Sequence, residues 1–442
     1  MSLRTTTRRV KVSFLLGAGA LAGAATLAFV LASSSGAVPR PQWTTVQQGL
    51  SAICETGTTF NLTTRTGHIQ TPDGGSVFMW GFTMDVGNVG QGGTGNGKFQ
   101  MPGPVLCVNE GDPITINLEN PAAPLGPGEP VSIVFRGQSG VLTSGGDVDG
   151  LFTREVTPGG ATVTYTFTAD EPGTYLYESG TNPHKQIEMG LYGALIVRPT
   201  GPGFGPNFAY NDASTEFDPA REYLLLMHEI DPALHLAVER IQPFDATTKH
   251  DRYWTINGRS FPDTVTNHFA PWLPAQPYGA FVWIRADSPQ PALIRYANAG
   301  LRNHPFHPHA NHVQVIARDG RPLGDLSMEA FTKTIGAGQT TDGLFRWNDV
   351  EHWTPDATVP VQIPGLLNLV FKDDYTSYSG SPYLGFQDDL PPAVATYNQC
   401  GEFYYPWHSH ALNEFQNFNE GFGGLATLLR VDPPLPKCPA SG

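Results

Sequence analysis

Apolar and polar positions alternate with a period of two along much of the chain. Residues 114–118 and 162–168 alternate in this way, so each predicts a strand with one buried face. A Glu171-Pro172-Gly173 turn leads into an apolar run at 174–177, and residues 190–197 form another strand-like run. From about residue 77 to residue 197 the pattern therefore predicts one β unit.

A second β unit is predicted in the C-terminal half, beginning near residue 222, with strand-like runs at 292–300, 313–320 and 425–431. Glycine, proline and asparagine are frequent just before it, which is typical of a linker. We therefore expect the following divisions: a leader at 1–37, an N-terminal domain at 38–200, a linker at 201–218, and a C-terminal domain at 219–436 with a loop-rich insertion near 346–398.

Composition supports an all-β fold. Fifty glycines and 39 prolines, with 15% charged residues, disfavour long helices and favour short strands joined by tight turns. A chain of 442 residues exceeds one typical core, so two consecutive β-sandwiches are expected.

The charge balance limits the classes of partner. A net charge of −14, with no basic patch in the sequence, disfavours binding to nucleic acid or to an anionic membrane surface.

The N-terminus is typical of a targeting segment. Basic residues up to Lys11 precede an uncharged stretch at 12–32, and Ser35-Gly36-Ala37 offers a small-residue cleavage site. We expect export to the periplasm, the medium or the cell surface. The apolar stretch is also long enough to remain as an uncleaved anchor, which would be the protein's one attachment to a membrane.

The cysteines are even in number, which in an exported chain favours disulfides. Proximity favours pairing Cys54 with Cys107 and Cys400 with Cys438, while a bridge between the two ends of the chain stays open.

Two histidine clusters carry the candidate chemistry. Side chains at i and i+2 of a strand share a face, so His307 with His309, and His408 with His410, each project two imidazoles in one direction. Imidazole nitrogen binds copper, zinc, iron or nickel. Each pair is therefore a candidate set of metal ligands, against the alternative of histidines that merely bond to one another or to solvent.

Other histidines have weaker patterns. Prolines disturb the strand parity near His304 and His312, so each is a secondary candidate for the metal site and is first expected to be a surface or supporting group. His228 and His235 have no ligand spacing and are expected to be ordinary core or surface residues.

Several segments together resemble the multicopper oxidases, which are built from successive cupredoxin domains of Greek-key β-sandwich type. The matching segments are Pro102-Gly103-Pro104, Glu110-Gly111-Asp112, Pro158-Gly159-Gly160, Gly173-Thr174-Tyr175, residues 190–197, Ile256-Asn257-Gly258 and both histidine clusters.

The chain departs from that family's pattern in three of its four ligand segments. Val134-Phe135-Arg136-Gly137 stands where the first histidine pair is expected, and Tyr177-Glu178-Ser179-Gly180 where the second is expected. The resemblance assigns His304, His307 and His309 to the type 1, type 2 and type 3 coppers respectively. It also places Ser409 at the type 1 cysteine, Glu414 near the later type 1 histidine, and Leu425 near the axial position.

In the fold that the resemblance implies, the two histidine clusters lie side by side, so we predict that His307, His309, His408 and His410 converge on a metal. The resemblance implies copper as this cofactor, in one site or a partial cluster. A serine hydroxyl cannot replace a thiolate, so we predict no blue type 1 centre and no standard laccase route to dioxygen reduction. Glu178 and His184 could join the site if the family's interdomain contact persists. Arg136 would then either repel the ion or neutralise Glu178.

We therefore expect an exported copper-dependent oxidoreductase without a type 1 relay, using a small molecule or a metal ion as reductant. The resemblance also implies a homotrimer. Two alternatives remain open: a non-catalytic protein that binds or sequesters copper in the cell envelope, and a structural module without metal.

Overall fold

The computed structural model describes residues 49–84, 98–286, 288–347, 370–371, 375–376 and 403–432. The predicted leader, almost all of the predicted insertion, Cys400 and Cys438 lie outside these residues. None of the helices in the described part combines the length and apolar character needed to cross a bilayer.

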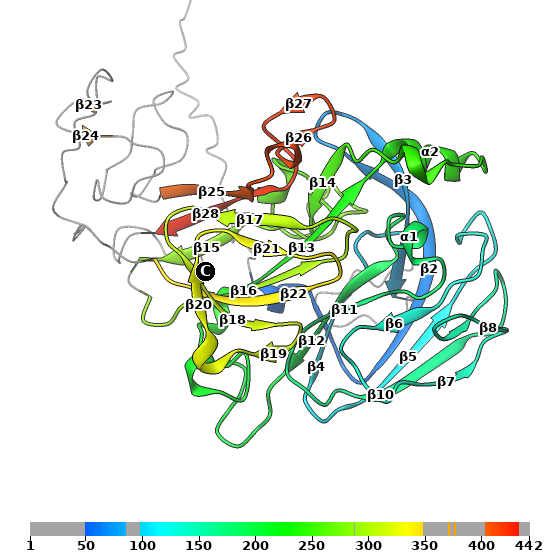
Figure 1. Ribbon diagram of the computed structural model, residues 1–442, viewed down its shortest axis with the longest axis horizontal. Coiled ribbons are helices and arrows are strands. Elements are labelled where there is room, and N and C mark those ends of the chain that lie inside the picture. Colours follow the sequence, from blue (N-terminus) through cyan, green and yellow to red (C-terminus); the bar gives the residue numbers. More distant parts are fainter. Residues whose placement is uncertain are drawn as a thin grey trace, which may run out of the picture. The chain divides into compact units, whose positions relative to one another are not determined.

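The N-terminal half forms two five-stranded sheets (Figure 1). The first has the order β1 (Cys54–Thr56), β4 (Val105–Asn109), β12 (Tyr192–Arg198), β11 (Gly173–Ser179), β6 (Ile133–Phe135). The second has the order β3 (Ser76–Met84), β2 (Thr59–Gln70), β5 (Pro113–Glu119), β10 (Val163–Thr168), β7 (Leu142–Gly145).

The C-terminal half forms a seven-stranded and a five-stranded sheet. The larger has the order β14 (Tyr253–Ile256), β13 (Glu222–Ile230), β16 (Ala292–Asn298), β22 (Thr340–Phe345), β18 (Val313–Arg318), β19 (Arg321–Pro322), with β20 (Met328–Ala330) also paired to β18. The smaller has the order β15 (Val282–Arg285), β28 (Ala426–Asp432), β25 (Phe403–Ser409), β17 (His304–Pro308), β21 (Lys333–Ile335).

Short ribbons and helices complete the described part. The ribbons are β8 (Val148–Asp149) with β9 (Arg154–Glu155), β23 (Val370–Phe371) with β24 (Tyr375–Thr376), and β26 (Gln416–Asn417) with β27 (Glu420–Gly421). The α-helices are α1 (Pro183–Gln186) and α2 (Pro232–Glu239). The 3-10 turns are η1 (Leu50–Ala52), η2 (Ala213–Thr215), η3 (Pro219–Arg221), η4 (Ala246–Thr248), η5 (Asp263–Val265), η6 (Gly324–Leu326) and η8 (Leu412–Glu414).

Period-two alternation explains the packing of each pair of sheets. In β12, Leu195 and Val197 face the core shared with the second N-terminal sheet, whereas Ala194 and Ile196 belong to a separate cluster. That cluster also contains residues of β13. The sheet that contains β12 and the larger C-terminal sheet therefore pack against each other through the faces that point away from their own sandwich cores. The prediction of an all-β fold with two consecutive sandwiches is confirmed.

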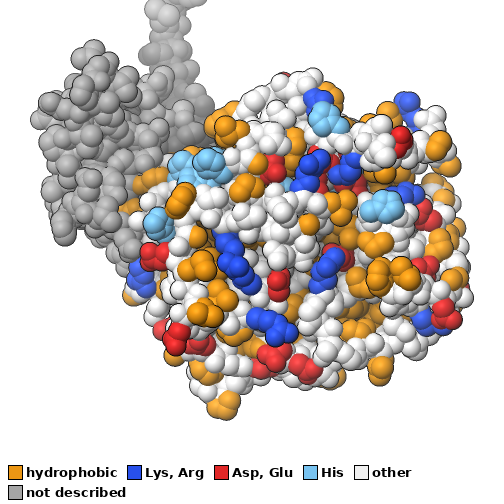
Figure 2. All heavy atoms as spheres, in the orientation of Figure 1, with side chains coloured by type: hydrophobic (Ala, Val, Ile, Leu, Met, Phe, Trp, Pro, Cys, Tyr) orange, Lys and Arg blue, Asp and Glu red, His pale blue; other side chains and the backbone are white. Residues whose placement is uncertain are grey.

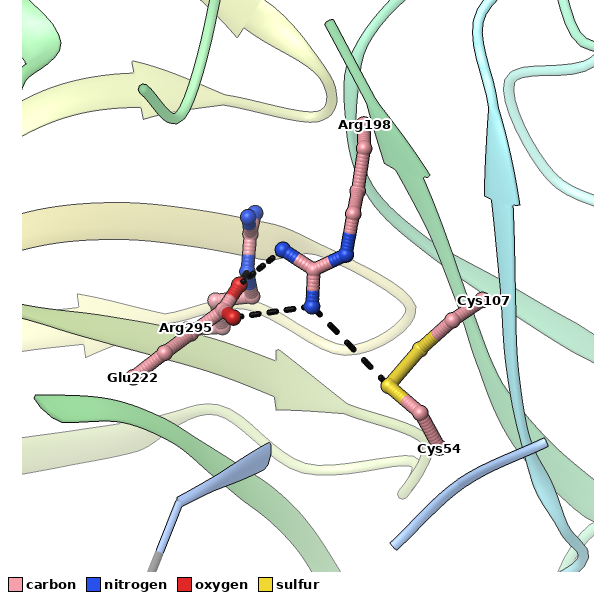
Figure 3. Close-up of a disulfide and its surroundings, with 5 residues drawn as sticks. All are labelled: Cys54, Cys107, Arg198, Glu222 and Arg295. Atoms are coloured by element: carbon pink, nitrogen blue, oxygen red, sulfur yellow. Dashed lines mark hydrogen bonds and ion pairs between the residues drawn. A yellow bond between two sulfur atoms is a disulfide. The ribbon is translucent and has the colours of Figure 1, made fainter. Parts of the chain in front are cut away.

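Buried ion pairs and one disulfide lie near the contact of the two halves (Figure 3). The predicted Cys54–Cys107 bridge is confirmed and joins β1 to β4. Arg198 of the N-terminal half donates to Glu222 of β13, and Arg295 of β16 donates to the same carboxylate at 2.7 Å. Burial acts against ionisation of Glu222, but the two guanidinium groups outweigh it and lower the pKa of this carboxyl.

The segment predicted as a linker packs closely onto the larger C-terminal sheet. Tyr210 and Phe217 are buried with Leu293 and Leu344. The Tyr210 hydroxyl donates to Asp342 on β22 at 2.5 Å. This connection is therefore part of the core rather than a free tether.

Candidate metal centre

The two histidine clusters lie on adjacent strands. β17 and β25 belong to one sheet (Figure 1) and pair antiparallel, and their register sets His307 directly opposite His408. Side chains opposite each other in such a pair are close neighbours on one face of the sheet. The predicted convergence of the histidine pairs is thus present in the described structure.

All four imidazoles are neighbours. The His307 ring centroid lies 4.6 Å from that of His309, 5.6 Å from that of His408 and 5.2 Å from that of His410. The closest nitrogen contact is 3.2 Å, between Nε2 of His309 and Nε2 of His408. Two nitrogens on one tetrahedral ion at roughly 2.0–2.1 Å would be about 3.3 Å apart, which matches this pair.

Hydrogen bonds to carbonyl groups fix two of the rings. His307 Nδ1 lies 2.6 Å from the Phe331 carbonyl oxygen, and His408 Nδ1 lies 2.7 Å from the Ser409 carbonyl oxygen. Because a carbonyl only accepts, each Nδ1 is the protonated nitrogen. Each Nε2 therefore carries the lone pair that a metal needs, as is usual for histidine ligands in proteins.

The cluster has only part of a finished coordination sphere. Among the described residues, no three His, Cys, Asp or Glu side chains are placed so that they could hold one metal ion without rearrangement. His309 and His408 provide the pair that is already in place. His307 and His410 would have to turn their rings to join it.

The local surroundings disfavour protonation of His309 and His408. Burial, followed by the neighbouring imidazoles of His307, His408 and His410, lowers the pKa of His309 to about 4. Burial also lowers the pKa of His408, although its bond to the Ser409 carbonyl opposes the change. Neutral imidazole is the form that binds metal ions.

The cluster opens to solvent on one side and rests on the core on the other. Figure 2 shows histidine side chains gathered at the surface over the region of β17 and β25. His410 is exposed, and His307, His309 and His408 are half-buried. On the inner side, fully buried Trp407 donates from Nε1 to the His309 carbonyl oxygen at 3.0 Å.

His304 is fully buried and bound to two carboxylates. Its Nδ1 lies 2.9 Å from Glu414 Oε2, and its Nε2 lies 3.2 Å from Glu229 Oε2. Burial alone lowers its pKa, but hydrogen bonds to Glu229 and Glu414 outweigh this effect and raise the pKa to about 9. His304 is therefore an imidazolium whose two nitrogens both donate, a supporting group as its sequence context indicated.

Ser409 completes the same buried cluster. Its Oγ donates to Glu414 Oε2 at 2.5 Å. Leu425 adjoins it, since the Ser409 amide donates to the Leu425 carbonyl and the Leu425 amide donates to the Glu414 carbonyl. The four positions that the family resemblance assigned to a type 1 copper thus converge. They offer neither a thiolate nor an imidazole with a free lone pair, so these residues do not fit that ion.

The weaker candidates have other surroundings. Arg136 Nε donates to Glu178 Oε1 at 2.6 Å, so of the two roles expected for Arg136 the structure has the pairing with Glu178. Burial raises the pKa of Glu178 although Arg136 opposes the change. His184 is an exposed residue of α1. His312 is exposed, and its Nδ1 lies 3.8 Å from Glu329 Oε2.

Glu229 belongs to this cluster but was not among the residues predicted from the sequence. It lies on β13, over 70 positions from His304, and no local spacing pointed to it. A clue exists at Gly300, where a Cβ would come within 1.9 Å of Glu229 Oε2. That glycine leaves room for the carboxylate, but it is recognisable only with the structure in hand.

Comparison with known proteins finds similarity to multicopper oxidases. Residues 83–201 match the family model described as multicopper oxidase. The chain is 38% identical over 115 residues to an iron transport multicopper oxidase of Epichloe festucae, covering 26% of this chain and 16% of that protein. It is 27% identical over 252 residues to Laccase-25 of Oryza sativa, covering 55% of this chain and 38% of that protein. A copper-containing nitrite reductase of Pseudomonas chlororaphis is 36% identical over 118 residues, covering 26% and 29% respectively.

These matches span less than half the length of each curated relative. Solved structures extend the likeness of the fold. A blue copper oxidase from Nitrosomonas europaea aligns with a TM-score of 0.56 and 20% identity, covering 84% of this chain and 85% of that chain. The multicopper oxidase mgLAC aligns with a TM-score of 0.54 and 18% identity, covering 86% and 89%. The shared sequence segments and the two sandwiches of cupredoxin type support a relationship to the cupredoxin-type multicopper oxidases, whose fold the chain shares.

Proposed function

We propose that this protein binds copper through a reduced histidine site and acts as a copper-dependent oxidoreductase without a type 1 centre. The ligands are His307, His309, His408 and His410, holding one ion or a partial cluster. The observation that carries the proposal is the 3.2 Å approach of the His309 and His408 Nε2 atoms beside two further imidazoles. Copper is the first choice among metals because it is the family's cofactor and because imidazole nitrogen suits it.

When bound, copper supplies one-electron redox chemistry. The chain's own residues orient the ligands: the Phe331 and Ser409 carbonyls hold Nδ1 of His307 and His408, so that each Nε2 is free. Ser409 and the contacts of His304 with carboxylates support the proposed lack of a type 1 centre. Glu178 and His184 are not included, because Arg136 engages the first and the second is exposed on α1.

The second candidate is a non-catalytic protein that binds or sequesters copper in the cell envelope. One observation favours it: only two of the four imidazoles are positioned to share an ion without rearrangement. A relay from a distant electron donor is not needed for storage or delivery of copper. The third reading, a structural module without metal, predicts no copper retention at all.

Partners and location complete the proposal. We propose export to the periplasm, the medium or the cell surface, a homotrimeric assembly, and a small molecule or metal ion as reductant. The net charge of −14 is suited to attracting cations and disfavours binding to nucleic acid.

Metal analysis after dialysis tests the proposal. The wild type is expected to retain copper, and the double variant His307→Ala/His410→Ala is expected to lose most of it. The exposed pair His184→Ala/His312→Ala is the matched control and is expected to retain wild-type stoichiometry. Full copper retention by the His307/His410 double variant would overturn the site.

Oxidation assays then separate the two copper-binding candidates. Phenols, Cu(I) salts and Mn(II) salts serve as reductants. Turnover that disappears in His408→Ala supports the oxidoreductase, whereas a copper-loaded wild type without turnover supports sequestration.

A further inference from the structure

A buried polar cluster lies directly behind the candidate copper histidines. It consists of Glu229 of β13, His304 of β17, Ser409 of β25 and Glu414 of η8, and we call it the carboxylate–imidazole cluster. Each of the four is at most 3% exposed. It joins one strand of the larger C-terminal sheet to two strands of the smaller sheet and to the following turn.

Most of the polar atoms in this cluster have partners. Glu229 Oε1 accepts from the backbone amides of Leu301 and Arg302, and Glu229 Oε2 faces His304 Nε2. Glu414 Oε2 accepts from both His304 and Ser409. The Ser409 hydroxyl also accepts from the Ala411 amide at 3.2 Å. A network of this kind favours one arrangement of its strands, because alternative arrangements leave buried charges without partners.

The cluster is connected to the copper histidines by the backbone. Ser409 lies between His408 and His410 in the sequence, and it pairs with Phe306, the residue before His307. The His410 amide donates to the carbonyl of Pro305, next to His304, at 2.7 Å. A shift of His304 or Ser409 would therefore move the strand segments that carry all the proposed ligands.

We propose that the carboxylate–imidazole cluster is a metal-free clamp that holds β17 and β25 in the register pairing His307 with His408, and that His304 and Glu414 are thus positioning residues for the copper site. The positioning role rests on the proposed copper function, whereas the clamp itself does not. Copper could bind His304 only by displacing a carboxylate, because Glu414 Oε2 and Glu229 Oε2 lie 2.9 Å and 3.2 Å from its two ring nitrogens.

Three variants test the clamp: Glu414→Gln, Ser409→Ala and His304→Phe. Glu414→Gln keeps the side-chain shape and removes the charge, and Ser409→Ala removes a single hydroxyl, so both test the proposal even if His304→Phe does not fold. The matched control is His312→Phe, which changes an exposed histidine that also faces a glutamate.

Amide hydrogen exchange in the metal-free protein gives the first readout. Exchange at the His410 amide is expected to accelerate about tenfold or more in Glu414→Gln and Ser409→Ala, with no change in His312→Phe. Unchanged exchange in both folded cluster variants would overturn the clamp. This measurement stands even if the wild type binds no copper, an outcome that would overturn the proposed function and the positioning role.

Copper binding gives the second readout. In Glu414→Gln and Ser409→Ala, Cu(II) affinity is expected to fall by about ten- to a hundredfold. The hyperfine pattern in the electron paramagnetic resonance spectrum is expected to change in the same variants. A wild-type spectrum and affinity in both variants, alongside accelerated exchange, would retain the clamp and overturn its role in positioning the ligands.

Discussion

Nε2 of His309 and Nε2 of His408 lie 3.2 Å apart, although the two residues are 99 positions apart in the sequence. This contact makes the two side chains the core of the proposed site. Replacing either by alanine is expected to weaken Cu(II) binding on the order of a hundredfold or more, since changes in mere supporting groups already cost ten- to a hundredfold. Competitive titration with a chelator of known affinity measures the change.

The control for that titration is His312→Ala, whose exposed side chain lies 3.8 Å from Glu329 and against the ring of Phe331. Its affinity is expected to match the wild type. Equal losses in His309→Ala and His312→Ala would place the copper elsewhere.

His304 is expected to make the free energy of unfolding decrease as the pH rises into the alkaline range. Glu229 and Glu414 face its ring and outweigh the effect of burial, so that its pKa rises to about 9 from an unfolded value near 6.5. The resulting stabilisation is fully present below about pH 6.5 and is lost as the pH rises through about 9. The free energy of unfolding is expected to fall by about 3 kcal/mol over this range.

Urea denaturation at several pH values measures that fall. His304→Phe is expected to lack this part of the pH dependence while remaining less stable than the wild type at pH 6. An equal decline in the wild type and the variant would contradict the assignment to His304.

His228 is expected to make the free energy of unfolding decrease as the pH falls into the acid range. It is fully buried on β13, and its Nε2 faces the Ile187 carbonyl at 3.1 Å. Burial lowers its pKa to about 4. As the pH falls, the unfolded chain therefore binds a proton at this residue near pH 6.5, whereas the folded chain binds it only near pH 4. The free energy of unfolding is expected to decrease by about 3 kcal/mol as the pH falls from 6.5 to 4.

The comparison for this prediction is His228→Phe, which keeps an aromatic ring against Tyr192, whose centroid lies 4.7 Å away. The variant is expected to show a flatter acid profile. His184→Gln, at an exposed histidine, is expected to leave the profile unchanged. A variant at position 228 with the full wild-type acid sensitivity would contradict the prediction.

The Cys54–Cys107 bridge closes a loop with a sequence separation of 53. A loop of that length restricts the unfolded chain, and its loss is expected to reduce the free energy of unfolding by about 4 kcal/mol. Denaturation of Cys54→Ala/Cys107→Ala, compared with the wild type with and without reductant, measures this change. A reduced wild type that is as stable as the oxidised protein would contradict the expected contribution.

Strand parity was enough to predict both the all-β fold and the sharing of a face within each histidine pair. The opposition of His307 and His408 was predicted only through family resemblance, because register across 101 positions depends on tertiary packing. The disulfide between Cys54 and Cys107 was favoured by proximity alone and is confirmed.

What the sequence did not indicate is the partner set of His304. Its two carboxylates come from β13 and η8, and neither has a local spacing to the histidine. The packing of residues 201–218 onto the sheet was also not predicted. A high content of glycine and proline indicates turns, but it does not indicate that Tyr210 and Phe217 are buried. Both cases depend on side chains that meet only after the sheets have stacked.

The indole of Trp407 donates to the backbone of His309 from beneath the histidines. Its ultraviolet emission should therefore be sensitive to a paramagnetic ion bound above it. The chain carries its own optical probe of metal occupancy, and subtracting the emission of a Trp407→Phe variant would isolate that signal from the other tryptophans.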